Sequence, residues 1–446
     1  MDIQDQAHKP RRTPAEARPL ERRGLPPQPL WVLLVLTGIV SASISLGFAF
    51  LTDRCLLPDT VTEGIAFVML AVTLFYLFRT CRLTARWLPS LLLLIAIPLC
   101  FLMGSVVPVM TMTAIVFCTA QAALLLAVCP VSTLYWLPIV PLGAYAVSLL
   151  LCRDPLLALT CLIPFPAAAA LAFGTRSCAS GPDKITRVGV ICLTSLVLGV
   201  TVLVPVLIGL AQSLDGGLSA LPELLDRIRE EETARIMEMS KAAAETIGSR
   251  PGPLSGLLGS EEALPSITEE EARNTVNSAI NMLPAFLVVV FNVTAALSQC
   301  ALYGSLGSFG YGDSVKGRVL LFKLSHAAGI TFLIAFIVSL ISAVTSKNST
   351  LAGTVAENIT FILQPGLALC GFMRLTVNLV ARSRGAVGCL PFIVLLFAPV
   401  LLTVGSSLLA LYESGALVLE LFLVRKSTDD DDPFADSGDQ NDSDPF

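Results

Sequence analysis

Long apolar stretches separated by short polar segments dominate the pattern of this sequence. The runs 30–51, 185–211 and 319–344 each hold about 20 or more mostly apolar residues, the length that an α-helix needs to cross a hydrocarbon core of about 30 Å. A helix of that length in a soluble protein would keep a polar face, and these runs do not. The pattern therefore predicts an all-α fold, a polytopic transmembrane helical bundle.

We predict about eleven spans, within a range of nine to thirteen, in two membrane regions at 29–211 and 279–424. Nine prolines between 88 and 174 interrupt nearly continuous hydrophobicity. Proline removes a backbone donor and bends a helix, so some segments there should be short, re-entrant or kinked. The expected spans lie at 29–51, 63–79, 88–103, 106–129, 134–152, 155–173, 186–211, 279–303, 319–345, 355–374 and 388–411.

Three polar segments flank or separate the membrane regions. Residues 1–28 are basic and rich in proline, and residues 425–446 are rich in aspartate; both compositions are typical of disordered tails. The acidic segment 212–278 has interrupted helical periodicity, and Thr268 and Glu271 have the spacing of a capping box that begins a helix. This segment is expected to be a helical loop, either a lid or partner-binding arm or simply solvated helices.

The distribution of basic residues predicts the orientation. Cytoplasmic loops are enriched in Lys and Arg, and basic clusters occur at 79–86, 176–187, 316–318 and 374–384. An even number of expected spans separates neighbouring clusters, which places the N-terminus in the cytoplasm and the acidic loop outside. The side of the C-terminal tail stays open, because the parity and Arg425-Lys426 favour opposite sides.

Composition supports lipid as the main environment and excludes several functions. The chain is 54% hydrophobic and 14% charged, against about 25% charged in ordinary soluble domains. The basic residues of the N-terminal tail lie beside the first expected span and form no separate basic face, so no nucleic-acid-binding face is predicted. The twelve cysteines form no Cys-x-x-Cys pair and are interpreted as small buried apolar residues. With no nucleophile elbow, zinc helix or P-loop in the sequence, we expect no catalytic residue, metal or cofactor.

A few polar residues within or near the spans are functional candidates, since ionisable groups inside a membrane often mark function. The candidates are His326, Asn292, Glu357 and Arg374. His326 is close enough to the expected interface for simple hydrogen bonding there. Glu357 and Arg374 fall near opposite ends of one span, while Glu413 and Glu420 follow the last expected span, positions that suit interface anchoring.

Small residues predict a place where helices approach closely, which we call the partner seam. Its residues recur at helical spacing in two spans, so another helix could lie against them. That helix could belong to this chain or to a partner subunit. The partner seam comprises Gly38, Ser41, Ala42, Ser45, Ala168 and Ala172.

Several short motifs occur in a characteristic order between residues 89 and 426. They are Ile163-Pro164-Phe165-Pro166, Phe173-Gly174, Leu283-Pro284-Ala285-Phe286 with Asn292, Gln364-Pro365-Gly366-Leu367-Ala368 and the run 420–426. In this order they resemble the YybS-like family of predicted bacterial membrane proteins. The extra N-terminal spans and the aspartate-rich tail depart from the family pattern.

The resemblance implies a function but assigns no site residues. The family layout is similar to that of the substrate-capture subunits (S-components) of energy-coupling-factor transporters. This implies a non-catalytic subunit of a small-solute transporter in the bacterial cytoplasmic membrane, working with a membrane coupling subunit. The alternative is a membrane scaffold or assembly subunit of an envelope or cell-shape complex. An S-component should contain an apolar pocket with a few polar groups, and a scaffold should expose small-residue surfaces.

Overall fold

The computed structural model describes most of the expected membrane regions, and what it describes there is helical apart from turns, short connections and an isolated β-bridge between Cys55 and Cys152. Its described residues are 30–52, 54–81, 92, 100, 104–128, 138–152, 154–180, 187–213, 217–248, 267–307, 324–345, 351–382 and 405–430. They form two compact units. The first unit comprises residues 1–228 and 287–321, and the second comprises 229–286 and 322–446.

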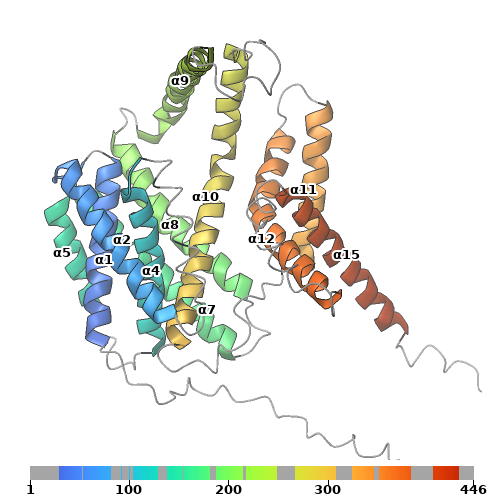
Figure 1. The fold of residues 1–446 in the computed structure, drawn as a ribbon, viewed down its shortest axis with the longest axis horizontal. Helices are drawn as coiled ribbons and strands as arrows, with labels where there is room; N and C mark the ends of the chain where they lie inside the picture. Colours follow the sequence, from blue (N-terminus) through green and yellow to red (C-terminus); the bar gives the residue numbers. More distant parts are fainter. Residues whose placement is uncertain are drawn as a thin grey trace, which may run out of the picture. The chain divides into compact units, whose positions relative to one another are not determined.

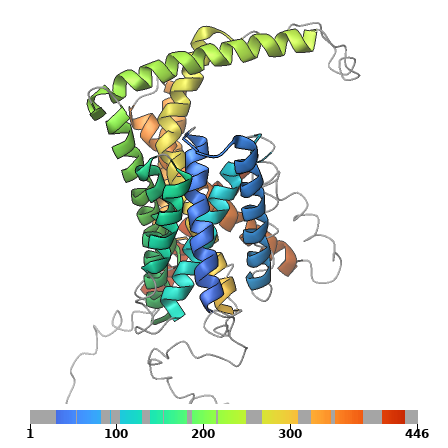
Figure 2. The ribbon, with the colours of Figure 1, turned by 90° about the vertical axis from the view of Figure 1, so that its left-hand side faces the viewer.

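The first unit is a helical bundle around α4 (Figures 1 and 2). α4 packs against α1, α2 and α7, and it is the most buried of the candidate spans in the described residues. The helices of this unit are α1 (Leu30–Leu51), α2 (Asp59–Cys81), α4 (Val107–Val128), α5 (Ile139–Leu151), α6 (Pro155–Ala158), the 3-10 turn η2 (Leu159–Leu162), α7 (Pro164–Ser180), α8 (Arg187–Ser213) and the 3-10 turn η3 (Gly217–Ala220).

The core of the first unit combines large and small side chains. Phe117 is fully buried on α4, and its ring meets the edge of Tyr76 at a centroid distance of 5.5 Å. Alanines on α4 and α7 let the backbones approach. Gly47 of α1 shows how closely: a Cβ there would overlap the Thr111 side chain of α4. The bundle therefore depends on small residues as much as on hydrophobic ones.

The second unit is built on three mutually packed helices, α11 (His326–Thr345), α12 (Leu351–Arg382) and α15 (Ser406–Asp430). Its core contains Phe332, Leu367, Leu409 and Leu417. Two further helices cross the boundary between the units: α9 (Leu221–Gly248) and α10 (Glu269–Leu306). The start of α10 belongs to the second unit, where the Asn358 side chain of α12 donates to the backbone carbonyl of Asn281 at 3.1 Å.

The capping box predicted in the acidic segment is confirmed. The Thr268 backbone N–H donates to a carboxylate oxygen of Glu271 at 2.9 Å, and the Glu271 N–H donates to the Thr268 hydroxyl at 3.3 Å. Both bonds satisfy donors that the first turn of a helix leaves unpaired. From there α10 continues for 38 residues through Pro284, as the sequence predicted.

Seven helices among the described residues are long and apolar enough to cross a membrane, and α5 and α11 are shorter apolar helices. α5 has 13 residues, a length of about 20 Å at 1.5 Å per residue, which agrees with the prediction of short segments in the proline-rich region. The segment expected as one span at 155–173 is divided into α6, η2 and α7. Most of the expected spans 88–103 and 388–411, the N-terminal tail 1–28 and the end of the aspartate-rich tail lie outside the described residues.

The last described helix extends past the expected end of the last span. That span was expected at 388–411 with a disordered tail from 425, and α15 begins at Ser406 and continues to Asp430. Glu413 and Glu420 therefore lie within this helix, where their carboxylates contact an arginine of the neighbouring helix.

Candidate functional site

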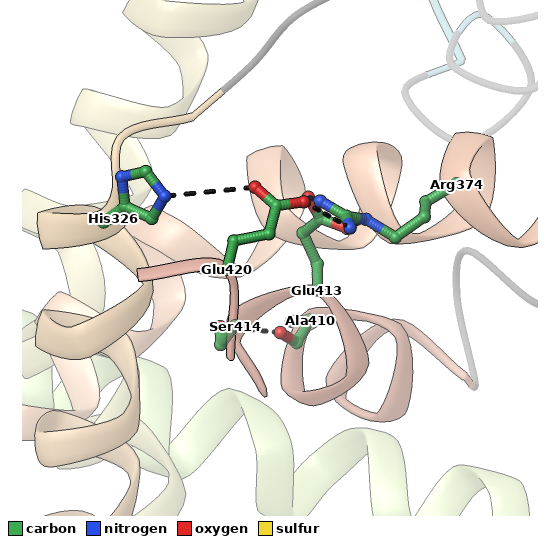
Figure 3. Close-up of polar contacts among 6 residues, drawn as sticks. All are labelled: His326, Arg374, Ala410, Glu413, Ser414 and Glu420. Atoms are coloured by element: carbon green, nitrogen blue, oxygen red, sulfur yellow. Dashed lines mark hydrogen bonds and ion pairs between the residues drawn. The ribbon is translucent and has the colours of Figure 1, made fainter. Parts of the chain in front are cut away.

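The strongest candidate site is a cluster of charged side chains where α11, α12 and α15 of the second unit meet (Figure 3). The Arg374 guanidinium of α12 donates to both carboxylate oxygens of Glu413, from Nε to Oε2 at 2.7 Å and from Nη2 to Oε1 at 3.1 Å. Its Nη1 donates to Oε1 of Glu420 at 2.8 Å. We call Arg374, Glu413, Glu420 and His326 the ionic cluster.

Helical spacing explains why two glutamates reach one arginine. Glu413 and Glu420 are seven residues apart on α15, two turns along the same face. His326 is the first residue of α11, and its Nε2 lies 3.9 Å from Oε2 of Glu420. The four side chains thus form a chain of contacts from α12 through α15 to α11.

The buried position of its charged groups distinguishes the ionic cluster from pairs on the surface. The Glu413 side chain is 6% exposed and that of Arg374 is 27% exposed. Among the described residues, Glu413 is the one charged residue that is buried. Two carboxylates face one guanidinium, and His326 lies beside the second carboxylate. Removing charge from water is costly unless it is paired, so the buried Glu413 carboxylate depends on the Arg374 guanidinium.

Glycines bring the three helices close enough for these contacts. A Cβ at Gly371 of α12 would overlap the carbonyl oxygen of Leu409 in α15. A Cβ at Gly329 of α11 would lie 3.3 Å from the side chain of Leu417 and 3.4 Å from Cα of Ser414. Gly371 is three residues from Arg374, so the closest backbone approach lies one helical turn from the ionic cluster.

Neutral polar contacts continue along the same helix pair. The Gln364 side-chain amide of α12 donates to the hydroxyls of Ser406 at 2.7 Å and Ser407 at 3.1 Å, both on α15. Gln364 precedes Arg374 by ten residues, a distance of about 15 Å along the helix. Pro365 follows it within α12 and removes one backbone donor there. We call Gln364, Ser406, Ser407 and the ionic cluster together the polar track.

The structure joins two of the four predicted polar candidates. His326 and Arg374 meet in the ionic cluster. Glu357 lies half-buried on α12, 17 residues before Arg374, and takes no part in it. Asn292 lies half-buried on α10 in the first unit. Glu413, expected as an interface anchor, is buried in the protein with its carboxylate against Arg374.

Sequence reasoning did not identify Glu413, Glu420 and Gln364 as site residues. A signal for the glutamates was present, since two carboxylates spaced by seven residues in an apolar helix fall on one face. Gln364 stood in a family-like motif but has no charge to draw attention. Which helix would face them depended on tertiary packing, which the pattern along the chain does not encode.

The partner seam is largely covered by helices of its own unit. The Ser41 hydroxyl donates to the Cys161 carbonyl at 2.6 Å, and the Ser45 hydroxyl donates to the Ala158 carbonyl at 3.0 Å. Ala168 and Ala172 are buried in the core of the first unit. These contacts take up the surface that four of the six seam residues would offer to a partner subunit.

The other two seam residues, Gly38 and Ala42, line an apolar groove of about 650 Å³ between α1, α2 and α5. Its remaining lining consists of aliphatic residues, methionine and small residues, with Ser43 as the polar member. The Ser43 hydroxyl donates to the Val40 carbonyl at 2.7 Å. The groove therefore suits apolar groups and has little to orient a polar solute.

Metal ligation has no geometric support in the part of the chain that the structure describes, where no group of three or more His, Cys, Asp and Glu could hold an ion. The sequence matches no protein-family model, no curated protein and no solved structure. The geometry of the polar track and of the groove is therefore the basis for any functional conclusion.

Proposed function

We propose that this chain is a multi-pass membrane protein and a non-catalytic subunit for the movement of a small polar solute or ion, which the polar track contacts. The observation that carries this proposal is the position of the track on α12. The apolar stretch of that helix covers Leu351–Phe372. Gln364 falls within it and Arg374 just beyond it, so the track leads from inside the span toward its edge.

Membrane physics supports a role for such a track. Polar groups inside a bilayer are costly and mark solute or ion pathways when they face the protein interior. Proline within a spanning helix is tolerated where neighbouring protein or water satisfies the freed carbonyl, and interrupted helices often form the binding sites of transporters. Pro365 lies beside Gln364 within the continuous helix α12, and the carboxylates of the ionic cluster would suit a cationic solute or a co-transported proton.

The resemblance to S-components fits this proposal. Such a subunit captures the solute, and a membrane coupling subunit with a separate ATPase supplies the work. The apolar groove at Gly38 and Ala42 would be the contact surface for that subunit, since small residues permit close helix approach. We place the protein in the bacterial cytoplasmic membrane with its N-terminus inside.

This orientation can be tested separately. Single cysteines would replace Ser255 and Ser314 in a chain lacking other reactive thiols, and intact cells would be treated with a membrane-impermeant maleimide. The distribution of basic residues predicts labelling at position 255 and none at position 314. Labelling at 314 alone would overturn the orientation.

A scaffold function is the alternative, and one observation favours it. Arg374 is already bonded to both glutamates, which is what a purely structural connection between helices would show. In that case the polar track would hold α11, α12 and α15 together and contact no solute.

The direct test is native mass spectrometry of the protein purified from its own membranes in a mild detergent. The proposal predicts a bound small polar molecule or a stoichiometric membrane partner. Harsher activation should release it, with loss of the corresponding mass from the complex. Recovery of the protein alone, in repeated preparations that remain monodisperse, would contradict the transport proposal and leave the scaffold function as the alternative.

A further inference from the structure

Two cysteines that are 97 residues apart in the sequence lie opposite each other in the first unit. Cys55 follows α1, Cys152 ends α5, and the two form an antiparallel β-bridge. The Leu56 N–H donates to the Leu151 carbonyl at 3.3 Å. The two cysteines therefore occupy the non-hydrogen-bonded position of the antiparallel bridge. Residues in that position have Cα atoms about 4.5 Å apart, within the range of about 4.4–6.8 Å found in disulfides.

Neighbouring contacts hold the two segments together. Arg54 pairs with Asp154 at 3.6 Å, so one ion pair flanks the cysteines. Asp154 also accepts the Leu156 N–H at 2.8 Å and caps α6. Because the cap fixes Asp154 and the bridge fixes the backbones, forming a bond between the sulfurs requires rotation of the side chains and little backbone movement.

The two thiols differ in access, which suits stepwise oxidation. Cys55 is half-buried with its sulfur 3.6 Å from the Thr62 hydroxyl, whereas Cys152 is buried with its thiol directed to the Ser45 carbonyl at 3.5 Å. An external oxidant therefore reaches Cys55 first. Cys152 is placed to complete the reaction inside the protein.

We propose that Cys55 and Cys152 form a disulfide by exchange with a disulfide-containing oxidant, either a small molecule or a protein. The Cys55 thiolate attacks the oxidant's disulfide, which forms a mixed disulfide and releases one thiol. The Cys152 thiolate then attacks the Cys55 sulfur, which forms the Cys55–Cys152 bond and releases the second thiol. Two protein thiols are oxidised, one external disulfide is reduced to two thiols, and the two protons leave with them.

The bond would tie the α1–α2 connection to the end of α5. In the orientation proposed above, this end of α1 lies outside the cytoplasm, where oxidising conditions let disulfides persist. The pairing itself rests on the bridge geometry and does not depend on that orientation or on a transport function.

The test uses the purified full-length protein, treated with oxidised glutathione, denatured in the presence of N-ethylmaleimide without reductant, and digested for mass spectrometry. The expected result is a linked peptide pair containing Cys55 and Cys152, while the exposed Cys192 takes up maleimide or glutathione. A Cys55→Ala variant should make Cys152 reactive toward maleimide, and a Cys192→Ala variant should keep the linked pair.

Three results would overturn the proposal: maleimide on both Cys55 and Cys152 after oxidation, a link from Cys152 to Cys161, or a Cys55→Ala variant in which Cys152 stays unlabelled. Size-exclusion chromatography of each variant distinguishes a changed thiol from a protein that fails to fold. Because peptide linkage is measured directly in the wild-type chain, the conclusion does not require any variant to fold.

Discussion

The first and second units keep their polar side chains inside the protein in different ways. In the first unit, hydroxyls donate to backbone carbonyls, as Ser41 and Ser45 do, and Gln121 donates to Ser305 at 3.0 Å. In the second unit, Gln364 makes a similar bond, but Arg374 and Glu413 add full charges. A neutral hydrogen bond contributes about 1 kcal/mol, whereas a buried charge that loses its partner costs several times more. The second unit therefore depends more strongly than the first on the pairing of a buried charge.

The largest effect should come from Arg374→Met. It leaves the buried Glu413 carboxylate without its guanidinium and removes one partner of the half-buried Glu420, so we expect a loss of about 3–5 kcal/mol and a clear fall in apparent Tm in detergent. Arg235→Met is the matched control, because its side chain is 69% exposed and paired with Glu232, and surface pairs contribute little. Adding Glu413→Met to Arg374→Met should recover part of the loss. No recovery would show that charge pairing is not the cause.

A smaller effect is expected from Gly371→Ala. The added methyl group meets the Leu409 carbonyl, which is backbone and cannot rotate away, so α12 and α15 must separate at a cost of about 1–3 kcal/mol. Gly415→Ala on α15 is the control, because a Cβ there meets nothing within 4 Å. Its apparent Tm should stay the same or rise. Equal behaviour of the two variants would mean that the close approach at Gly371 does not hold the second unit together.

The smallest effect should come from the first unit. Ser45→Ala removes the donor to Ala158 and the acceptor for the Thr160 hydroxyl, which lies 3.2 Å away, and should cost about 0.5–1.5 kcal/mol. Thr52→Ala removes an exposed hydroxyl that donates to Phe48 and should change the apparent Tm less. If Ser45→Ala lowered the stability as much as Arg374→Met does, the two units would not differ in how strongly they depend on their polar side chains.

Sequence reasoning predicted the features that depend on local patterns. Hydrophobic length predicted α1 and α8 within a few residues, and the spacing of Thr268 and Glu271 predicted the start of α10. Both signals need only neighbouring residues, since a capping box is made within one turn and a span is defined by its own composition.

Features that depend on contacts between distant residues were not predicted. Glu413 was expected to follow the last span, and its pairing with Arg374 of another helix was not predicted. Cys55 and Cys152 read as separate small apolar residues, because no spacing motif connects them. The partner seam was recognised as a place of close approach, but the sequence left open that η2 and α6 of the same chain would cover Ser41 and Ser45.

The central claim is that the polar track contacts a solute, and two glutamines with the same local role test it most directly. Gln364 and Gln121 each donate from a helix to serine on another helix, the first within the polar track and the second in the core of the first unit. Gln364→Met and Gln121→Met would be compared by native mass spectrometry for occupancy of the co-purifying solute, with apparent Tm measured alongside. The account predicts similar small losses of stability in both, but at least about a tenfold weaker solute affinity, or about 1.4 kcal/mol, only for Gln364→Met. Full solute retention by a folded Gln364→Met variant, or equal loss by both, would contradict it.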